Sequence, residues 1–278
     1  MSAPETQKRR PNPFYPAFDL LLAKLLAAEQ ALRVSETLFE NALESPDEWL
    51  SQIPEGELPG MLADICDLGI PGYVKNIPSF RWPDREKDYL LRAVSDFRTQ
   101  SCLWCIARAF EDFREFAGAV ERSITHDGAP CPSHLDTWVA RLLPKRKKEP
   151  DRRFSAVLKR IRDSAPSLVT CERGNARKIQ LQQWICMAAA VRHAVAHSEG
   201  ILKQTDYKTY GSSGLEEHFP GELEEGTGYV LKPTLDSTAK TIRTFREYGV
   251  AIYKTVSEAQ GFSPVLVGPD GEITTWRR

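Results

Sequence analysis

The strongest constraint on the fold is a stretch of roughly forty residues, from Asp84 to Ile124, that contains no proline and only one glycine, Gly118. Its large apolar residues recur mostly at steps of three, four or seven: Leu90, Val94, Phe97, Trp104, Ile106, Phe110, Phe113 and Phe116. This spacing predicts a long amphipathic helix, either continuous or broken once near Ser101. A helix of this length needs other helices to cover its apolar face, so we expect a helical bundle.

Three further stretches have a helical pattern. The first covers residues 16–45, where apolar side chains recur at Phe18, Leu21, Leu25, Leu32, Phe39 and Leu43. A second, from about 175 to 199, is a mostly apolar run that Gly200 is placed to end. The third, residues 236–259, carries Ile242, Phe245, Ile252 and Val256. We therefore predict an all-α fold class.

Proline and glycine interrupt this pattern elsewhere. Residues 46–83 contain six prolines, so they leave room only for short helices and are expected to form an insertion packed over the bundle. Ser133 is a suitable N-cap for a short helix through Leu143. Residues 203–233 are rich in Gly, Ser and Glu and end in GYVLKP, which predicts a loop or small β-hairpin. The tail, 260–278, contains Pro-Asp-Gly and is expected to form another hairpin.

Overall composition excludes few functions. Lys and Arg total 37 and Asp and Glu total 38, so the formal net charge of −1 shows no global preference for polyanions. The first residues, MSAPETQKRRPNP, lack the apolar core of a secretory signal. No stretch approaches the roughly 18 to 20 continuous apolar residues that a membrane-spanning helix needs. We expect a cytoplasmic protein with no membrane partner.

The six cysteines are expected to be reduced thiols, because a chain of this size does not need disulfides to fold. Cys102 and Cys105, followed by Cys131 and His134, have the pairwise spacing of a four-ligand zinc site. The first pair lies inside the long predicted helix, where cysteine commonly serves as a small apolar residue. A zinc-stabilised adaptor built on these four residues is one alternative for the chain.

A basic segment follows. Residues 141–162 contain ten Lys or Arg residues against two acidic ones, a local net charge of +8. Such a segment is either a solvated surface or a site that attracts phosphates. The residues with which we expect it to bind RNA are Lys145, Arg146, Lys147, Lys148, Arg152 and Arg153.

The predicted helix 175–199 ends in VRHAVAHSEG, which places an arginine and two histidines in two turns. His193 and His197 are four residues apart and share one helix face, whereas Arg192 and His197 differ by about 140° around the axis. One interpretation is that these side chains only cap the helix C-terminus. Another is a zinc pair, but Ala194 stands where zinc proteases have their glutamate, and no third ligand is evident. A third is phosphate chemistry, which needs proton carriers and a cation.

The stretch VRHAVAHSEGIL resembles the signature of the HEPN superfamily, in which an arginine, a polar residue and, a few positions later, a histidine form the motif. Arg192, His193 and His197 occupy these places, although His193 stands where asparagine is usual. The segments SCLWCIARAFEDFREFAG and GYVLKPTLDSTAKTIRTF are similar to the helix before the motif and to the strand and helix after it. The resemblance covers about residues 84–258.

The resemblance implies a single HEPN-like helical domain over 1–278, an antiparallel bundle with a small β-hairpin insertion after the motif helix. It also implies a metal-independent endoribonuclease without a cofactor, working as a homodimer in which both subunits line the cleft. Such a protein would be a toxin or antiphage-defence effector that acts on RNA and is controlled by an antitoxin or another regulatory partner. The alternative within the family is a non-catalytic module that acts through its dimer surface.

Within this resemblance each residue of the motif has an expected role. Arg192 would stabilise the phosphorane, His197 would transfer protons, and His193 would position the phosphate or assist. Glu111, with Asp112 beside it on the preceding helix, could orient Arg192 or His197 by a charged hydrogen bond. Both acids could equally be solvated side chains.

Overall fold

The structure is a computed structural model that describes residues 12–45, 48, 87–126, 152–211, 214–267 and 273–275. The chain divides into two compact units. The first comprises residues 1–31 and 102–278, and the second comprises residues 32–101. The predicted helix at 133–143, the proline-rich region and the turn of the tail hairpin lie outside the described residues.

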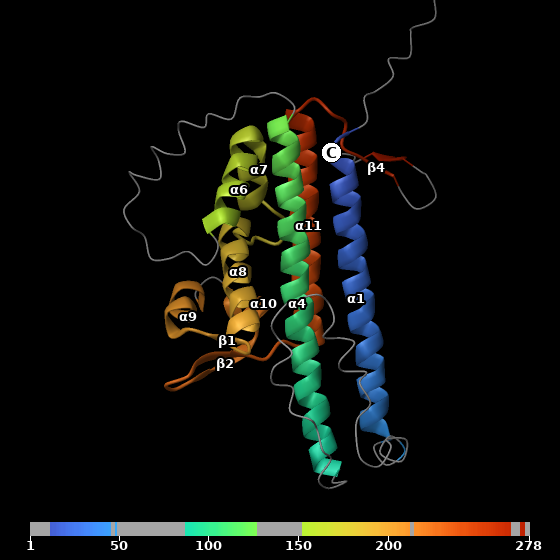
Figure 1. Cartoon of the computed structure of the whole chain (residues 1–278), viewed down its shortest axis with the longest axis vertical. Coiled ribbons are helices and arrows are strands. Elements are labelled where there is room, and N and C mark those ends of the chain that lie inside the picture. Colours follow the sequence, from blue (N-terminus) through green and yellow to red (C-terminus); the bar gives the residue numbers. More distant parts are fainter. Residues whose placement is uncertain are drawn as a thin grey trace, which may run out of the picture. The chain divides into compact units, whose positions relative to one another are not determined.

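Most of the described residues are helical, which confirms the predicted fold class (Figure 1). The helices are α1 (Tyr15–Glu44), α4 (Lys87–His126), α6 (Arg152–Ser164), α7 (Ser167–Arg173), α8 (Leu181–His197), α9 (Gln204–Tyr210), α10 (Leu215–His218) and α11 (Leu235–Ala259). The strands are β1 (Ile201–Leu202), β2 (Gly221–Glu224), β3 (Gly228–Leu231), β4 (Val265–Val267) and β5 (Ile273–Thr275). None of the described helices combines the length and apolar character needed to cross a membrane.

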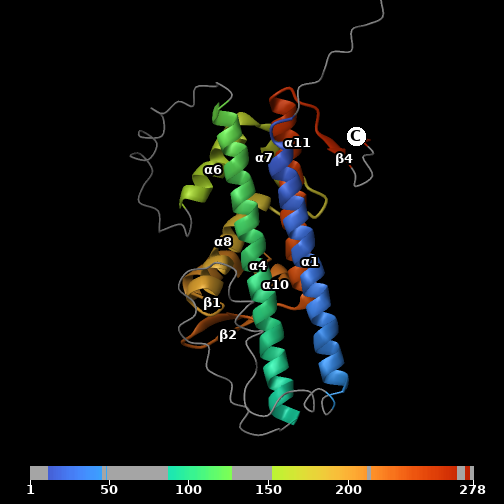
Figure 2. The same cartoon turned by 45° about the vertical axis from the view of Figure 1, so that its right-hand side comes forward.

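Within the first unit, α1, α4 and α11 lie side by side (Figure 2), and aromatic side chains from all three form a core. Phe18 of α1 stacks on Tyr253 of α11, with ring centroids 4.3 Å apart. Phe113 of α4 stacks on Tyr248 of α11 at 5.1 Å and also contacts Phe245. Such aromatic pairs stabilise the fold by more than the burial of their apolar area alone. Phe110, Phe113 and Phe116 of the long proline-free stretch are therefore core residues, as their spacing indicates.

The contacts also fix the helix directions. α4 and α11 run parallel, because Phe110 contacts Phe245 and Phe113 contacts Tyr248 one turn further along both helices. α1 runs antiparallel to both of them, and α8 runs antiparallel to α4 (Figure 1). The predicted antiparallel arrangement thus holds for α1 and α8 against the pair formed by α4 and α11.

In the second unit, the C-terminal part of α1 packs on the N-terminal part of α4. The rings of Phe39 and Phe97 meet edge to face with centroids 5.6 Å apart. Arg98 forms an ion pair with Glu36, donating from Nε at 2.8 Å. An aromatic contact and an ion pair between described residues thus join the two helices here.

The insertion after α8 contains a three-stranded antiparallel sheet in the order β1-β3-β2, which confirms the hairpin predicted between 203 and 233. Leu202 pairs with Tyr229, and Leu223 pairs with Tyr229 from the other side. The tail strands β4 and β5 are also antiparallel, as predicted.

The long helix α4 is continuous through Ser101, which is one of the two alternatives that its sequence left open. Two local predictions were wrong. The helix that carries the motif begins at Leu181, about six residues later than predicted, and the chain before it belongs to α7 and a loop. The segment predicted as loop or hairpin also contains the short helices α9 and α10.

Candidate functional site

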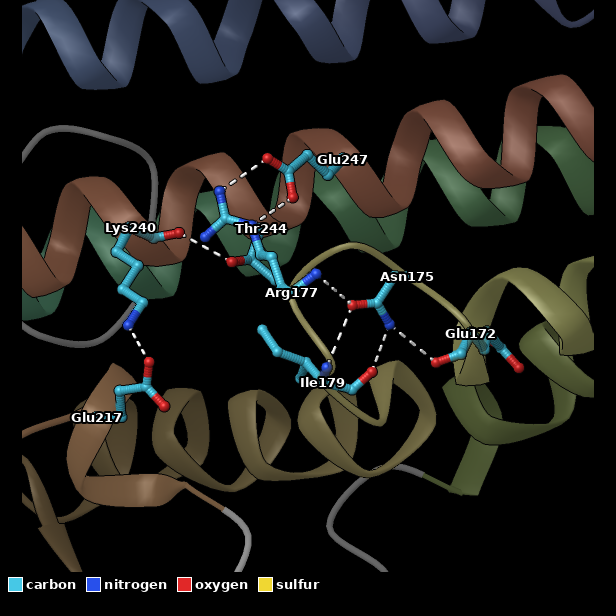
Figure 3. Close-up of polar contacts among 8 residues, drawn as sticks. All are labelled: Glu172, Asn175, Arg177, Ile179, Glu217, Lys240, Thr244 and Glu247. Atoms are coloured by element: carbon cyan, nitrogen blue, oxygen red, sulfur yellow. Dashed lines mark hydrogen bonds and ion pairs between the residues drawn. The ribbon is translucent and has the colours of Figure 1, made fainter. Parts of the chain in front are cut away.

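The start of α8 is set by one side chain in the loop before it. Oδ1 of Asn175 accepts hydrogen bonds from the backbone N–H groups of Arg177 at 3.2 Å and Ile179 at 3.1 Å, and Nδ2 donates to the carbonyls of Glu172 and Ile179 (Figure 3). Arg177 in turn pairs with Glu247 of α11 through two hydrogen bonds. Asparagine offers the backbone an alternative to helical hydrogen bonds, so the loop persists and α8 begins only afterwards.

A buried polar cluster fixes α6 and α7 to α11. Nε of Arg162 donates to both carboxylate oxygens of Glu172 at 2.9 Å, and the hydroxyl of Tyr248 donates to the same carboxylate. Glu172 is only 2% exposed, so its charge is stable there because both partners satisfy it. The cluster is a structural anchor on the opposite end of α8 from the motif.

The end of α8 confirms the prediction that Gly200 terminates the motif helix. The backbone N–H groups of Ser198 and Gly200 both donate to the carbonyl of Ala194, at 2.8 and 3.1 Å. Gly200 has φ +83°, and a Cβ there would lie 3.0 Å from Cδ1 of Leu103. Glycine is therefore needed both for the left-handed conformation and for the close approach to α4.

Arg192 is oriented by an acid from α4. Its Nε lies 2.5 Å from Oε1 of Glu111, and the other oxygen of Glu111 lies 2.7 Å from Arg114. Asp112, the neighbouring candidate, instead pairs with Lys24 and Arg108 and is nearly buried. The predicted contact between Glu111 and Arg192 is therefore present.

The two histidines lie side by side on the surface. The ring centroids of His193 and His197 are 4.6 Å apart, and both side chains are exposed. Partial desolvation, followed by the neighbouring imidazole of His197, lowers the pKa of His193. Lys203 and Arg192 act in the same direction, whereas Asp206 opposes them. A lowered pKa favours the neutral imidazole, which can accept a proton.

Lys203 and Asp206 are site residues that the sequence reasoning missed. Both lie close enough to His193 to influence its charge, and Asp206 belongs to the first turn of α9. Their position shortly after the end of α8 is the sequence signal that could have identified these two residues. A segment that leaves a helix through a left-handed turn and then re-forms a helix tends to fold back beside the helix end.

The described residues contain no group of three or more His, Cys, Asp or Glu side chains that could hold a metal ion. Cys102 is buried in α4, and burial next to Cys102 raises the pKa of the Cys105 thiol to about 11. Burial of Cys102 inside α4 fits the alternative in which the cysteine serves as a small apolar residue. The other two proposed ligands, Cys131 and His134, lie outside the described residues.

The basic segment is only partly described. Arg152 and Arg153 begin α6, but the structure describes only their backbone. Residues 145–148 lie outside the described residues. Two of the other cations have internal partners: Arg160 donates to Glu121 at 2.6 Å, and Arg162 belongs to the buried cluster. The local charge of +8 therefore overstates what is available to phosphates.

No family model matches the chain, no curated protein matches it, and no solved structure matches it.

Proposed function

We propose that the chain is a metal-independent endoribonuclease of the HEPN type, which cleaves RNA by attack of the 2′-hydroxyl on the adjacent phosphate. The observation that carries the proposal is the grouping of Arg192, His193 and His197 at the end of α8, with Glu111 orienting the arginine. Two exposed imidazoles in contact and one oriented guanidinium are the groups that this reaction requires.

In the proposed reaction, neutral His193 accepts the proton of the 2′-hydroxyl while the 2′-oxygen forms a bond to phosphorus. The bond between phosphorus and the 5′-oxygen then breaks, and His197 supplies the proton that the leaving oxygen needs. The products are a 2′,3′-cyclic phosphate and a free 5′-hydroxyl. The lowered pKa of His193 supports its role as the base, because more of it is neutral near pH 7.

Arg192 is suited to bind the phosphate because only one edge of its guanidinium is committed. Its Nε faces Glu111, and no described residue accepts a hydrogen bond from its two terminal nitrogens. With 31% of the side chain exposed, these nitrogens can reach a phosphate from solvent. A guanidinium binds phosphate oxygens in pairs, which suits the charge that develops on the phosphorane.

The biological setting in this proposal comes from the resemblance to the HEPN superfamily. It comprises a homodimer, a role as toxin or antiphage-defence effector, and control by an antitoxin or another regulatory partner. The exposed cation Lys159 and the basic residues 145–148, 152 and 153 support attraction of the RNA backbone, which high salt would weaken. Sedimentation equilibrium of the purified chain measures the dimer directly.

The test is cleavage of a labelled RNA pool in EDTA by the wild type beside Arg192→Ala and His197→Ala. The proposal expects cleavage by the wild type only, leaving 2′,3′-cyclic phosphate ends. Arg243→Ala is the matched control, because Arg243 is an exposed arginine on α11. Circular dichroism and thermal unfolding establish that each variant is folded.

Two results would overturn the proposal. Cleavage by both site variants at the wild-type rate would show that the activity does not belong to α8. RNA bound by the wild type but never cut, at any salt concentration, would instead support a non-catalytic binding module.

A further inference from the structure

A pocket of about 290 Å³ lies between α6 and α8. α6 lines it with Ser155 and Lys159, α8 lines it with Gln182 and Cys186, and Tyr210 lines it from the last turn of α9. The three helices thus each contribute polar side chains to one cavity.

The pocket and the imidazole pair share one face of α8. Gln182, Cys186 and Ala189 line the pocket, and His193 and His197 follow at the next two positions with the same spacing of about one turn. Since α8 rises about 1.5 Å per residue, Ala189 and His193 are roughly 6 Å apart along the axis. A ligand in the pocket would therefore adjoin the proposed catalytic groups.

The lining has the chemistry of a site for a flat polar ring. Phe154, Leu158 and Ile185 supply buried apolar surface. Gln182 offers an amide that both donates and accepts hydrogen bonds, and Tyr210 offers an aromatic face beside its hydroxyl.

The charge of the lining favours an anion. Lys159 is exposed and has no ion-pair partner among the described residues, and no Asp or Glu of the described part of the chain lines the pocket. Arg162 also lines it, but its guanidinium is held by Glu172 and Tyr248. The positive charge at the pocket that is available to a ligand is therefore that of Lys159.

We propose that this pocket holds one nucleotide of a single-stranded RNA, with its base against Tyr210 and Gln182 and its backbone phosphate near Lys159, so that the neighbouring phosphate reaches Arg192 and His193. Proteins read unpaired RNA bases by stacking on aromatic rings and by hydrogen bonds to base edges, and a cavity of this volume suits one nucleotide. The inference rests on the ribonuclease function proposed above and adds its substrate class.

Binding is measured with a short single-stranded RNA that is 2′-O-methylated throughout, because it lacks the attacking hydroxyl and cannot be cut. Tyr210→Ala and Gln182→Leu should each weaken binding about tenfold, as expected for the loss of one base contact. Gln183→Leu is the matched control: it makes the same change at the next, exposed position of α8, which does not line the pocket. It should bind within about twofold of the wild type.

A second measurement needs no variant. Cys186 lines this pocket, whereas Cys171 lies in a different pocket between the α7–α8 loop and α11. The rate of cysteine alkylation is measured by mass spectrometry. The methylated RNA should slow alkylation of Cys186 and leave alkylation of Cys171 unchanged. Equal rates with and without RNA at Cys186 would contradict occupation of the pocket.

The outcomes separate this inference from the proposed function. If the wild type cuts RNA while the pocket variants bind and cut like the wild type, the pocket inference fails and the ribonuclease stands. If the pocket variants lose binding of the methylated RNA while unmodified RNA is never cut, the nucleotide site stands and the ribonuclease fails. If the wild type neither binds nor cuts RNA, both fail.

Discussion

Glu111 on α4 and Arg192 on α8 form an ion pair in which Oε1 and Nε are 2.5 Å apart, although eighty-one positions separate the two residues in the sequence. Both lie on long helices of the first unit, and about two turns beyond the pair Gly200 approaches Leu103 closely. A pair held between helices is placed more exactly than one on loops. Arg192 is therefore oriented before any substrate arrives.

Replacing Glu111 by Gln is expected to lower the rate of RNA cleavage by about 10- to 100-fold. The change removes the carboxylate charge that faces Arg192, and a 10- to 100-fold lower rate corresponds to about 1.4–2.8 kcal/mol of lost transition-state stabilisation. Glu111→Asp should recover part of the rate, and the melting temperature should stay close to that of the wild type. The loss should appear in kcat, because the pair orients Arg192 for the transition state.

The matched control for that prediction is Glu115→Gln. Glu115 is on the same helix, one turn along, and pairs with Lys24 at 2.7 Å. It should cleave RNA at the wild-type rate. Equal losses in the two variants would show that Glu111 acts through α4 stability and not through Arg192.

The pH dependence of cleavage should follow His193. Its pKa lies below the ordinary value of 6.5, so the fraction of neutral imidazole rises with pH and is larger at pH 7 than for an ordinary histidine. The rate is therefore expected to increase with pH along a limb whose midpoint is below 6.5. His193→Ala should remove this limb from the profile of kcat/KM, whereas an unchanged limb would exclude His193 as the base.

Periodicity predicts the long helices of this chain because tertiary packing uses the same apolar positions. Phe110, Phe113 and Phe116 mark a helix face in the sequence, and all three are buried in the structure. The position of Gly200 also predicts the end of α8, because glycine readily takes the left-handed conformation that it has there. These features depend on residues near one another along one helix.

The parts that could not be predicted depend on where side chains find partners. The start of α8 shifts to Leu181 because Asn175 bonds the loop backbone, and Lys178 takes a positive φ of 57°. Counting charges cannot show that Arg160 and Arg162 are paired internally. In the candidate site, sequence reasoning finds the motif and Glu111 but not the residues that α9 brings beside them.

Glu172→Ala is expected to destabilise the fold by about 3–5 kcal/mol, because it leaves the Arg162 guanidinium buried without its counter-ion. Glu247→Ala is the control, since it removes a carboxylate that is about half exposed and pairs with Arg177. That variant should lose no more than about 1 kcal/mol. Urea unfolding of both variants measures the difference, and similar losses would contradict the assignment of the Glu172 cluster as the anchor of α6 and α7.

Asn175→Ala should lower the unfolding free energy by about 2–3 kcal/mol, because four side-chain hydrogen bonds to the loop are lost and each contributes roughly 0.5–1.5 kcal/mol before compensation by water. Asn175→Asp keeps the two bonds accepted from the N–H groups of Arg177 and Ile179 but loses the two donated to carbonyls. Hydrogen exchange should show faster exchange of the Ile179 amide in the alanine variant than in the aspartate variant. Equal exchange in the two would exclude the loop as the origin of the loss.

His218 should make the fold sensitive to mild acid. The side chain is 2% exposed, packs against Trp184, and has an Nδ1 atom without a hydrogen-bond partner. Burial lowers its pKa to about 4, with the charge of Lys240 acting in the same direction. Below pH 6.5 the unfolded chain therefore binds a proton that the folded chain does not, so stability falls as the pH falls from 6.5 to about 4.

His218→Phe isolates this effect, because phenylalanine keeps an aromatic ring beside Trp184 and cannot be protonated. At pH 5 the proton that unfolding takes up corresponds to about 2 kcal/mol, given a folded pKa of about 4 against 6.5 in the unfolded chain. Between pH 7 and pH 5, the unfolding free energy of the wild type should thus fall by about 2 kcal/mol more than that of the variant. Carboxylates elsewhere titrate in both proteins and cancel in this difference, so parallel curves would mean that His218 is protonated in the folded state as readily as in the unfolded chain.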